Sequence, residues 1–355
     1  MKKIRMGVVG VGGMAQAHIA GINDSPDAEL TAVCDIVPKT LAAVGDRNGV
    51  PESHRFASYK DLIACPDVDA VSICTPNYLH FAMGMDAVKA GKPFLIEKPV
   101  TMAAAEAVEL EAAAKAAGIP NMVDFSYRFK AAARYAKMLV ASGALGQIRQ
   151  VYGQYLQSWS NNPQNTRAWR YVKAEAGTGV LGDLGSHLMD MASFITGRKI
   201  LSLVSHTDTL VHERPLPDGT GAGAVDVDDY CDILAKMEGG VAASLSVTRF
   251  AFARGNYQRM EVYGSRGGLV YKLDEDGKGG DVLEVCIGGD PANIRRYLPA
   301  DIPKECYVEQ FQSFFDIVLH KEDGLAGVMA DGAVNQALLD AAEKSAATGQ
   351  WVSVE

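Results

Sequence analysis

The sequence has no excess of positive charge. Its 34 Lys and Arg stand against 43 Asp and Glu, which gives a net charge of -9. Without a basic field to attract phosphates, nucleic acid and anionic membranes are disfavoured as partners. No run of about eighteen apolar residues, the length that spans a bilayer, is present. No apolar h-region follows Met1 to Ile4, so we expect no signal peptide, no membrane segment and a cytoplasmic location.

The sequence also lacks the cysteine spacings of a disulfide framework or a zinc site. Its six cysteines are scattered and form no CxxC pair, at Cys34, Cys65, Cys74, Cys231, Cys286 and Cys306. This usage indicates reduced thiols and no metal site. Repeats and low-complexity linkers are absent too. A length of 355 residues with 48% hydrophobic content is typical of a globular protein with about two domains.

A glycine-rich turn follows the first apolar run. Ile4 to Val9 reads as a buried strand, Gly10 to Ala15 has the spacing GxGxxA, and a helical stretch follows. Leu30 to Cys34 reads as the next strand and ends at Asp35. A strand, a glycine turn, a helix, a strand and an acid form the dinucleotide-binding fingerprint in its expected context.

Each position of this turn has a physical reason. Gly10 permits the tight turn, Gly12 lets the backbone approach a pyrophosphate, and Ala15 lets the helix pack on the strand. Free N–H groups at the helix N-terminus can bind the phosphates. Asp35 can accept hydrogen bonds from the ribose hydroxyls, which favours NAD over NADP, although Lys39 lies close in sequence.

The alternation of strands and helices continues to residue 124. Apolar strands at Asp69 to Cys74, Phe94 to Ile96 and Ile119 to Asp124 are separated by helical patterns. The sequence therefore predicts an N-terminal Rossmann domain over residues 1–124, with a doubly wound parallel sheet. Glu97 and Lys98 follow a strand, where such sheets bind ligands; the alternative is that they only cap the strand.

Residues 125–355 have a different pattern and are expected to form an α+β domain on a mostly antiparallel open sheet. Seven strand-like runs are predicted, several with alternating polarity, at Ile148 to Trp159, Ile200 to Thr209, Tyr230 to Met237, Val241 to Thr248, Arg259 to Gly264, Gly268 to Leu273 and Val282 to Ile287. Arg214 to Gly223 reads as an exposed loop. The closing helix, near 331–348, can pack back on the first domain.

A second glycine-rich stretch, Gly177 to Asp190, contains Asp183 and His187. On a helix these two residues, four apart, share one face. A carboxylate there can orient the imidazole and raise its proton affinity, which suits a general acid/base. The alternative is a capped helix with an incidental histidine.

Together these stretches resemble the Gfo/Idh/MocA oxidoreductase family over almost the whole chain. The matching motifs are Gly10 to Ala15 with His18, Cys74 to Asn77 with His80, Ala90 to Pro99 with Glu97-Lys98-Pro99, Trp169-Arg170, and Gly179 to Asp190. Two departures are mild: Thr178 interrupts the glycine run before the catalytic helix, and Ala15 replaces the third glycine.

The resemblance implies NAD(P)-dependent oxidation of a secondary alcohol on a sugar, glycoside or inositol-like polyol. It implies that His187 takes the hydroxyl proton, that Lys98 stabilises charge on that oxygen, and that Asp183 orients His187. It also implies a homodimer or homotetramer through the open sheet face. Alternatives are a glycosidase that retains NAD and a non-catalytic NAD-binding regulator.

The resemblance and the residue patterns also predict the remaining site residues. The expected cofactor-binding residues are Gly10, Gly12, Gly13, Met14, Asp35, Thr75, Pro76, Asn77, His80, Glu97, Lys98, Arg128, Trp169 and Arg170. The expected substrate-binding residues are Lys98, Tyr127, Trp159, Asp183 and His187. For Tyr127, Arg128, Trp169 and Arg170, ordinary packing and surface charge remain the alternative.

Overall fold

The chain forms two compact units, seen here in a computed structural model that describes residues 3–288, 290 and 293–354. Unit 1 comprises Met1–Phe125 and Val308–Val334. Unit 2 comprises Ser126–Tyr307 and Asn335–Glu355. The sequence placed all of residues 125–355 in the second domain, so the return of Val308–Val334 to unit 1 differs from that expectation.

Hydrogen bonds of its backbone N–H and C=O groups explain why the segment Val308–Val334 belongs to unit 1. The N–H of Val123 donates to the carbonyl of Gly327 at 2.8 Å. The N–H of Met329 donates to the side-chain oxygen of Asn121 at 2.7 Å. The edge of the first sheet is therefore completed by chain that comes from the end of the sequence, together with helix α9 (Gln310–Val318). Such long-range pairing has no signature in local sequence.

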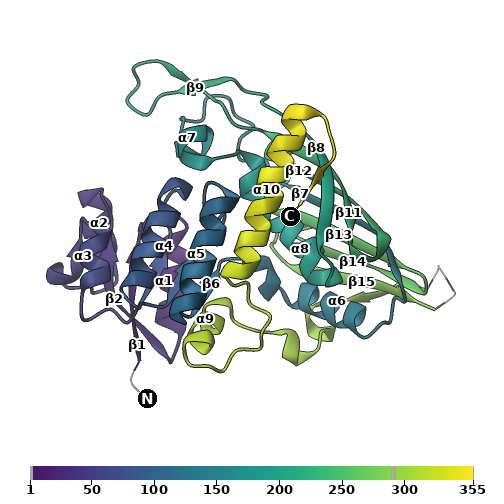
Figure 1. The fold of residues 1–355 in the computed structure, drawn as a ribbon, viewed down its shortest axis with the longest axis horizontal. Helices are drawn as coiled ribbons and strands as arrows, with labels where there is room; N and C mark the ends of the chain where they lie inside the picture. The colour runs from purple at the N-terminus through teal and green to yellow at the C-terminus, as the bar shows by residue number, and fades with distance from the viewer. Residues whose placement is uncertain (1–2, 289, 291–292, 355) are drawn as a thin grey trace. The chain divides into compact units, whose positions relative to one another are not determined.

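Unit 1 is built on a six-stranded parallel sheet, as predicted (Figure 1). Its strands are β1 (Ile4–Val9), β2 (Ala28–Cys34), β3 (Arg55–Phe56), β4 (Ala70–Ile73), β5 (Phe94–Ile96) and β6 (Asn121–Val123). Their order is β3-β2-β1-β4-β5-β6. Strand β1 pairs with both β2 and β4, so the winding reverses there, which is where such folds bind ligands.

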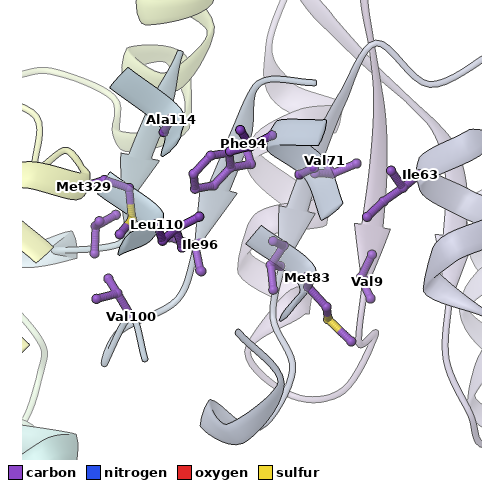
Figure 2. Close-up of a cluster of buried hydrophobic side chains, with 14 of the residues drawn as sticks. Val9, Ile63, Val71, Met83, Phe94, Ile96, Val100, Leu110, Ala114 and Met329 are labelled. Carbon is purple, nitrogen blue, oxygen red and sulfur yellow. The ribbon is translucent and has the colours of Figure 1, made fainter. Parts of the chain in front are cut away.

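Helices cover both faces of this sheet. They are α1 (Ala15–Asp24), α2 (Pro38–Arg47), α3 (Tyr59–Ala64), α4 (His80–Lys89) and α5 (Ala104–Ala117). Ile73 of β4 packs in the apolar cluster with Met83 of α4 and Leu110 of α5, part of which Figure 2 shows. Its neighbour Ser72 points to the opposite face, because side chains alternate along a strand, and there it meets His18 of α1.

The residues that follow the strands continue the ladder across one edge of the sheet. Backbone hydrogen bonds place them side by side in the order Asp35, Gly10, Cys74, Glu97 and Asp124. The fingerprint turn, the Cys74 to Asn77 turn and the Glu97-Lys98-Pro99 turn therefore share the carboxyl edge. The Lys98–Pro99 peptide bond is cis.

Unit 2 is built on a nine-stranded sheet, antiparallel except where β7 runs parallel to β12. Its order is β16-β15-β14-β13-β7-β12-β11-β8-β17. The strands are β7 (Ile148–Leu156), β8 (Ile200–Asp208), β11 (Tyr230–Met237), β12 (Val241–Thr248), β13 (Tyr257–Gly264), β14 (Gly267–Leu273), β15 (Asp281–Ile287), β16 (Arg295–Tyr297) and β17 (Val352–Ser353). The mostly antiparallel sheet predicted from the sequence is confirmed.

One face of this sheet carries helices and the other faces outward. The helices of unit 2 are α6 (Ala131–Ala141), α7 (Lys173–Ala176), α8 (Ser186–Thr196) and the part of α10 (Met329–Thr348) from residue 335 onward (Figure 1). Ser205 donates its hydroxyl to the carbonyl of Ala342 at 2.6 Å, which ties α10 to β8. The outer face leaves Leu234 and Tyr152 exposed.

The sequence suggested an exposed loop from Arg214 to Gly223, but the structure differs. The segment forms a hairpin of β9 (Glu213–Pro215) and β10 (Ala222–Ala224). Arg214 is buried. Its guanidinium can be buried because it donates hydrogen bonds to the carbonyls of Ser160 and Asn162 at 2.8 Å each. In the part of the chain that the structure describes, no helix is both long and apolar enough to cross a bilayer.

Candidate active site

The glycine turn after β1 has the geometry that nucleotide binding requires. Gly10 has a φ of 80°, and a Cβ there would lie 2.9 Å from the carbonyl oxygen of Cys74. Only glycine fits such a position without strain. A Cβ at Gly12 or Gly13 would meet no heavy atom within 4 Å, and both glycines are exposed. The turn is therefore tight against the protein and open toward solvent.

Helix α1 begins directly behind this turn. Met14, at its N-terminal boundary, is 50% exposed, and no acidic residue lies in the first turn. An unshielded helix N-terminus with free N–H groups attracts phosphate. The turn and the helix together have a geometry that suits the pyrophosphate of a dinucleotide; that Gly10, Gly12, Gly13 and Met14 bind it stays a prediction.

Asp35 lies at the end of β2, beside the glycine turn. Its two carboxylate oxygens accept hydrogen bonds from the N–H groups of Val11 at 3.0 Å and Val37 at 2.8 Å. The side chain is therefore held in place from both sides and remains partly exposed. A fixed carboxylate at this position can accept hydrogen bonds from ribose hydroxyls.

The turn after β4 is held by a buried histidine. Thr75 and Pro76 are partly exposed, while Asn77 begins a 3-10 turn that leads into α4. Both ring nitrogens of His80 face backbone carbonyls, Nδ1 that of Pro99 at 2.8 Å and Nε2 that of Thr75 at 2.9 Å. Burial lowers the pKa of His80, against the two carbonyls that raise it. His80 therefore links two turns from within the protein.

Glu97 and Lys98 follow β5, and they differ in exposure. Glu97 is buried, and one of its oxygens, Oε2, accepts a hydrogen bond from the backbone N–H of Lys98 at 3.2 Å. Lys98 is partly exposed at the carboxyl edge of the sheet. The carboxylate therefore holds the backbone from which the lysine side chain extends.

In unit 2, Asp183 lies in an irregular turn and not in a regular α-helix. Residues Leu181–Gly185 form a π-helical turn, and α8 begins at Ser186. Asp228 starts this turn by accepting the N–H groups of Gly179 at 2.6 Å and Leu181 at 2.7 Å. A Cβ at Gly179 would lie 1.9 Å from the Asp228 carbonyl oxygen, so the glycine is required there. π-Turns of this kind occur frequently at functional sites.

His187 lies in the first turn of α8, 6% exposed, against two tyrosine rings. Its ring centroid is 4.7 Å from that of Tyr127 and 6.3 Å from that of Tyr155. The two tyrosine hydroxyls lie 2.6 Å apart, and both donate to Oδ1 of Asn256, at 3.0 Å from Tyr127 and 2.6 Å from Tyr155. These contacts fix the two tyrosines, of which Tyr127 lies edge-on to the imidazole and Tyr155 lies tilted beside it.

The negative charge of Asp183 affects the pKa of Tyr155, one of the two tyrosines beside His187. Burial, Tyr127 and the Asp183 carboxylate, in that order of cause, raise the pKa of Tyr155 well above its usual value. The hydroxyl therefore stays protonated. Tyr155, Asn256 and Gln157, whose amide donates to the Tyr155 hydroxyl at 3.0 Å, were not found from the sequence. No local motif marks them, because they meet only through pairing of distant strands.

The other predicted residues of unit 2 have separate surroundings. Arg128 is buried and its guanidinium holds Asp190 of α8, with contacts of 2.5 to 3.1 Å. Trp169 and Arg170 form one partly exposed turn, in which the guanidinium lies 4.4 Å from the indole centroid. Trp159 is 36% exposed beside the guanidinium of Arg249. Their roles toward cofactor or substrate stay predictions.

Among the residues that the structure describes, two groups of side chains bring metal-type ligand atoms within 4.8 Å of one another. The first, at the surface of unit 1, is His54, Cys65 and Asp67. The second, in the interior of the same unit, is His18, Glu97 and Asp124. In both groups the histidine already contacts a carboxylate at 3.1 to 3.3 Å, a hydrogen-bonding distance.

The two halves of the chain match two described protein families. Residues 4–125 match the oxidoreductase family with the NAD-binding Rossmann fold, and residues 133–270 match the GFO/IDH/MocA C-terminal domain. Levoglucosan dehydrogenase of Pseudarthrobacter phenanthrenivorans is 32% identical over 316 residues, which is 84% of this chain and 80% of that protein. The chain belongs to the Gfo/Idh/MocA oxidoreductase family and is an NAD-binding oxidoreductase.

Other relatives cover the chain almost completely. Inositol 2-dehydrogenase of Rhizobium meliloti is 25% identical, over 99% of each protein. Among solved structures, levoglucosan dehydrogenase in complex with NADH and levoglucosan superposes with a TM-score of 0.89 at 29% identity, over 99% of this chain and 100% of that one. The resemblance inferred from the sequence motifs is therefore confirmed at the level of family and fold.

Proposed function

We propose that the protein oxidises a secondary hydroxyl of a sugar or cyclic polyol, with NAD as the hydride acceptor. His187 takes the proton of that hydroxyl, Lys98 donates a hydrogen bond to its oxygen, and Asp183 orients His187. The observation that most supports the proposal is His187 itself, an imidazole that lies edge-on to Tyr127 and tilted beside Tyr155, just after a π-turn.

The surroundings of His187 suit proton transfer. A general base must keep one orientation while it accepts a proton. The rings of Tyr127 and Tyr155 limit rotation of the imidazole, and Asn256 limits rotation of the tyrosines. The carboxylate of Asp183, whose charge reaches the same group, stabilises the imidazolium that forms.

Lys98 serves the same oxygen from the nucleotide-binding unit. An ammonium stabilises negative charge that develops on an alcohol oxygen as its proton leaves, and such stabilisation is a large contribution to catalysis. NAD, when bound, supplies the acceptor for the hydride. The glycine turn binds its pyrophosphate, and Asp35 binds its adenosine ribose.

The relatives define the substrate class to be tested first. Those with printed activities include a levoglucosan dehydrogenase and an inositol 2-dehydrogenase. Both names describe rings that carry several secondary hydroxyls. We therefore propose a pyranose-like sugar or an inositol as substrate, with levoglucosan as the first compound to assay.

The test is an NAD reduction screen at 340 nm with levoglucosan, inositols, aldoses and glycosides. We expect NADH formation with a ring alcohol, faster with NAD than with NADP. Release of a sugar from a glycoside without net NADH would support an NAD-retaining glycosidase instead. NAD binding without turnover of any alcohol or glycoside would support a non-catalytic regulator.

A substitution at Asp35 tests the cofactor assignment. We expect Asp35→Ala to lower the ratio of kcat/KM for NAD to that for NADP by about ten- to a hundredfold, since charged hydrogen bonds to the ribose are lost. Asp35 also holds Val11 and Val37, so Asp35→Asn, which keeps the shape and one of the two acceptor oxygens, serves as a partial control for the turn. Equal losses with both cofactors in Asp35→Ala would reject the ribose contact.

The outer face of the nine-stranded sheet is proposed as the surface for self-association. It exposes Leu201, Leu234 and Tyr152, and exposed apolar sheet faces commonly serve as interfaces. Sedimentation of the purified protein measures the outcome. A monomer at micromolar concentration would contradict the proposal.

A further inference from the structure

A charged cluster that the reaction does not use lies buried in unit 1, beneath the Lys98 turn. His18, on the buried face of α1, is completely buried. Its Nδ1 lies 2.8 Å from the hydroxyl of Ser72 on β4. Its Nε2 lies 3.2 Å from Oε1 of Glu97, after β5, and 3.1 Å from Oδ2 of Asp124, after β6. One imidazole therefore connects α1 to the ends of three neighbouring strands.

The cluster is closed from the other side by the segment that returns late in the chain. The ring of Phe311 in α9 lies 5.0 Å from the His18 ring. The side-chain amide of Gln310 donates to Oδ1 of Asp124. All of these residues belong to unit 1. His18, Glu97 and Asp124 are all buried, so solvent screens their charges little and the protonation of each depends on the others.

Because Nε2 of His18 lies at hydrogen-bonding distance from two carboxylate oxygens, at least one proton must lie between the histidine and the two carboxylates. Burial alone lowers the pKa of His18, but Cys74 and the hydrogen bonds to Asp124 and Glu97 raise it well above its usual value. Burial and the neighbouring Glu97 raise the pKa of Asp124. The first direction favours a protonated imidazole and the second favours a proton on the acidic pair, so both favour protons held within the cluster.

Each carboxylate uses its second oxygen to hold a different segment. Oε2 of Glu97 accepts the backbone N–H of Lys98 at 3.2 Å. Oδ1 of Asp124 accepts the amide of Gln310 and so holds α9. The chain of contacts from His18 through Glu97 to Lys98 is thus separate from the chain through Asp124 to Gln310.

Stability alone does not explain such a cluster. Ala15, Ile19 and Ile22 make the rest of the buried face of α1 apolar. Replacing buried ionic groups by apolar side chains of similar volume is often neutral or stabilising. A function of the cluster in placing Lys98 explains it better, since a shift of about 1 Å in a catalytic group can reduce turnover about a hundredfold.

We propose that His18 is a positioning residue for Lys98. Its imidazole fixes the Glu97 carboxylate, and this carboxylate fixes the backbone from which the Lys98 side chain extends. Because His18 lies on the helix whose N-terminus faces the nucleotide turn, the same contact joins cofactor binding to the placement of the lysine. The inference rests on the proposed role of Lys98.

The test compares His18→Leu and Glu97→Gln with Gln310→Leu. His18→Leu and Gln310→Leu each remove a hydrogen bond of the buried cluster, and Glu97→Gln removes the negative charge and replaces one acceptor oxygen with an amide donor. Only His18→Leu and Glu97→Gln alter the contacts that lead to Lys98. We expect His18→Leu and Glu97→Gln to lower kcat by about ten- to a hundredfold, with the dissociation constant of NAD, measured by fluorescence quenching, unchanged within severalfold. Gln310→Leu is expected to lower the melting temperature and leave kcat within severalfold of the parent.

A further variant, His18→Gln, and a second measurement keep the inference testable if His18→Leu folds poorly. His18→Gln keeps a donor near the Nε2 position and is expected to recover part of the lost kcat. Competitive acetylation, followed by mass spectrometry, measures the reactivity of the Lys98 amine against exposed Lys115 without any turnover. We expect His18→Leu and Glu97→Gln to change this ratio severalfold and Gln310→Leu to leave it unchanged.

The outcomes separate this inference from the proposed function. If Lys98→Ala abolishes turnover while folded His18→Leu and Glu97→Gln keep both normal kcat and normal Lys98 reactivity, the positioning role is wrong and the proposed function stands. If Lys98→Ala turns over normally, the proposed role of Lys98 fails while the dehydrogenase activity stands, and the acetylation ratio still decides whether the cluster places Lys98. One equivalent of metal in the parent, absent from His18→Leu, would overturn the inference in favour of a metal site.

Discussion

His187→Ala is expected to lower kcat by about a hundred- to ten-thousandfold, the usual contribution of a positioned general base. The imidazole is held by Tyr127 and Tyr155 in unit 2, whereas the nucleotide turn belongs to unit 1. NAD affinity is therefore expected to remain within severalfold of the parent. The measurements are steady-state turnover on the substrate identified in the screen and NAD binding by fluorescence.

One further variant and a rescue experiment test whether the His187 result is specific. His206 lies exposed on β8, so His206→Ala controls for loss of an imidazole in the same unit and should retain full turnover. Added imidazole is expected to restore part of the activity of His187→Ala, because the truncated side chain leaves room beside the two tyrosines. A His187→Ala enzyme with near-normal kcat would remove the histidine from the mechanism.

The parts of the fold that could be predicted are those set by local sequence. The spacing of Gly10, Gly12 and Ala15 between two apolar runs is a local pattern, and the strand–turn–helix that it predicts is present. The strands Tyr230–Met237 and Val241–Thr248 also follow from alternation within each run, with a turn of positive φ at Gly239 and Gly240 between them. Neighbouring residues determine these features, so one sequence suffices to predict them.

Distant contacts explain what could not be predicted. Asp228 reaches back to Gly179 and Leu181 and produces a π-turn where helical spacing predicted an ordinary turn around Asp183. Arg214 is charged and begins a stretch whose Pro- and Gly-rich composition predicted an exposed loop, yet its side chain is buried against Ser160. In each case a buried polar group finds its partner on another segment, and no periodicity records that pairing.

The same limit applies to the candidate site. His187 and Lys98 could be proposed because each stands in a recognisable local motif. Tyr155, Asn256 and Gln310 could not, since the contacts of Tyr155 with Asn256 and of Gln310 with Asp124 join segments a hundred or more residues apart. The residues proposed to act on a substrate stand in local motifs here, while Tyr155, Asn256 and Gln310 do not.

Lys98→Ala is the second substitution with a large expected effect. Loss of one donor to a developing oxyanion lowers kcat by about a hundred- to a thousandfold in enzymes where it has been tested, and we expect a loss of that size. Lys89, whose side chain is 71% exposed on α4, provides the matched control, and Lys89→Ala should turn over normally.

Comparing the activity of Lys98→Arg with that of Lys98→Ala shows whether Lys98 acts through its positive charge alone or through a directed hydrogen bond. Lys98→Arg keeps the positive charge, but its planar guanidinium presents donors in a different direction from an ammonium. If Lys98 acts by a directed hydrogen bond to the alcohol oxygen, Lys98→Arg is expected to remain nearly as slow as Lys98→Ala, and added alkylamines should partly restore Lys98→Ala. Full activity in Lys98→Arg would mean that positive charge alone suffices, and the directed hydrogen bond would then have to be abandoned.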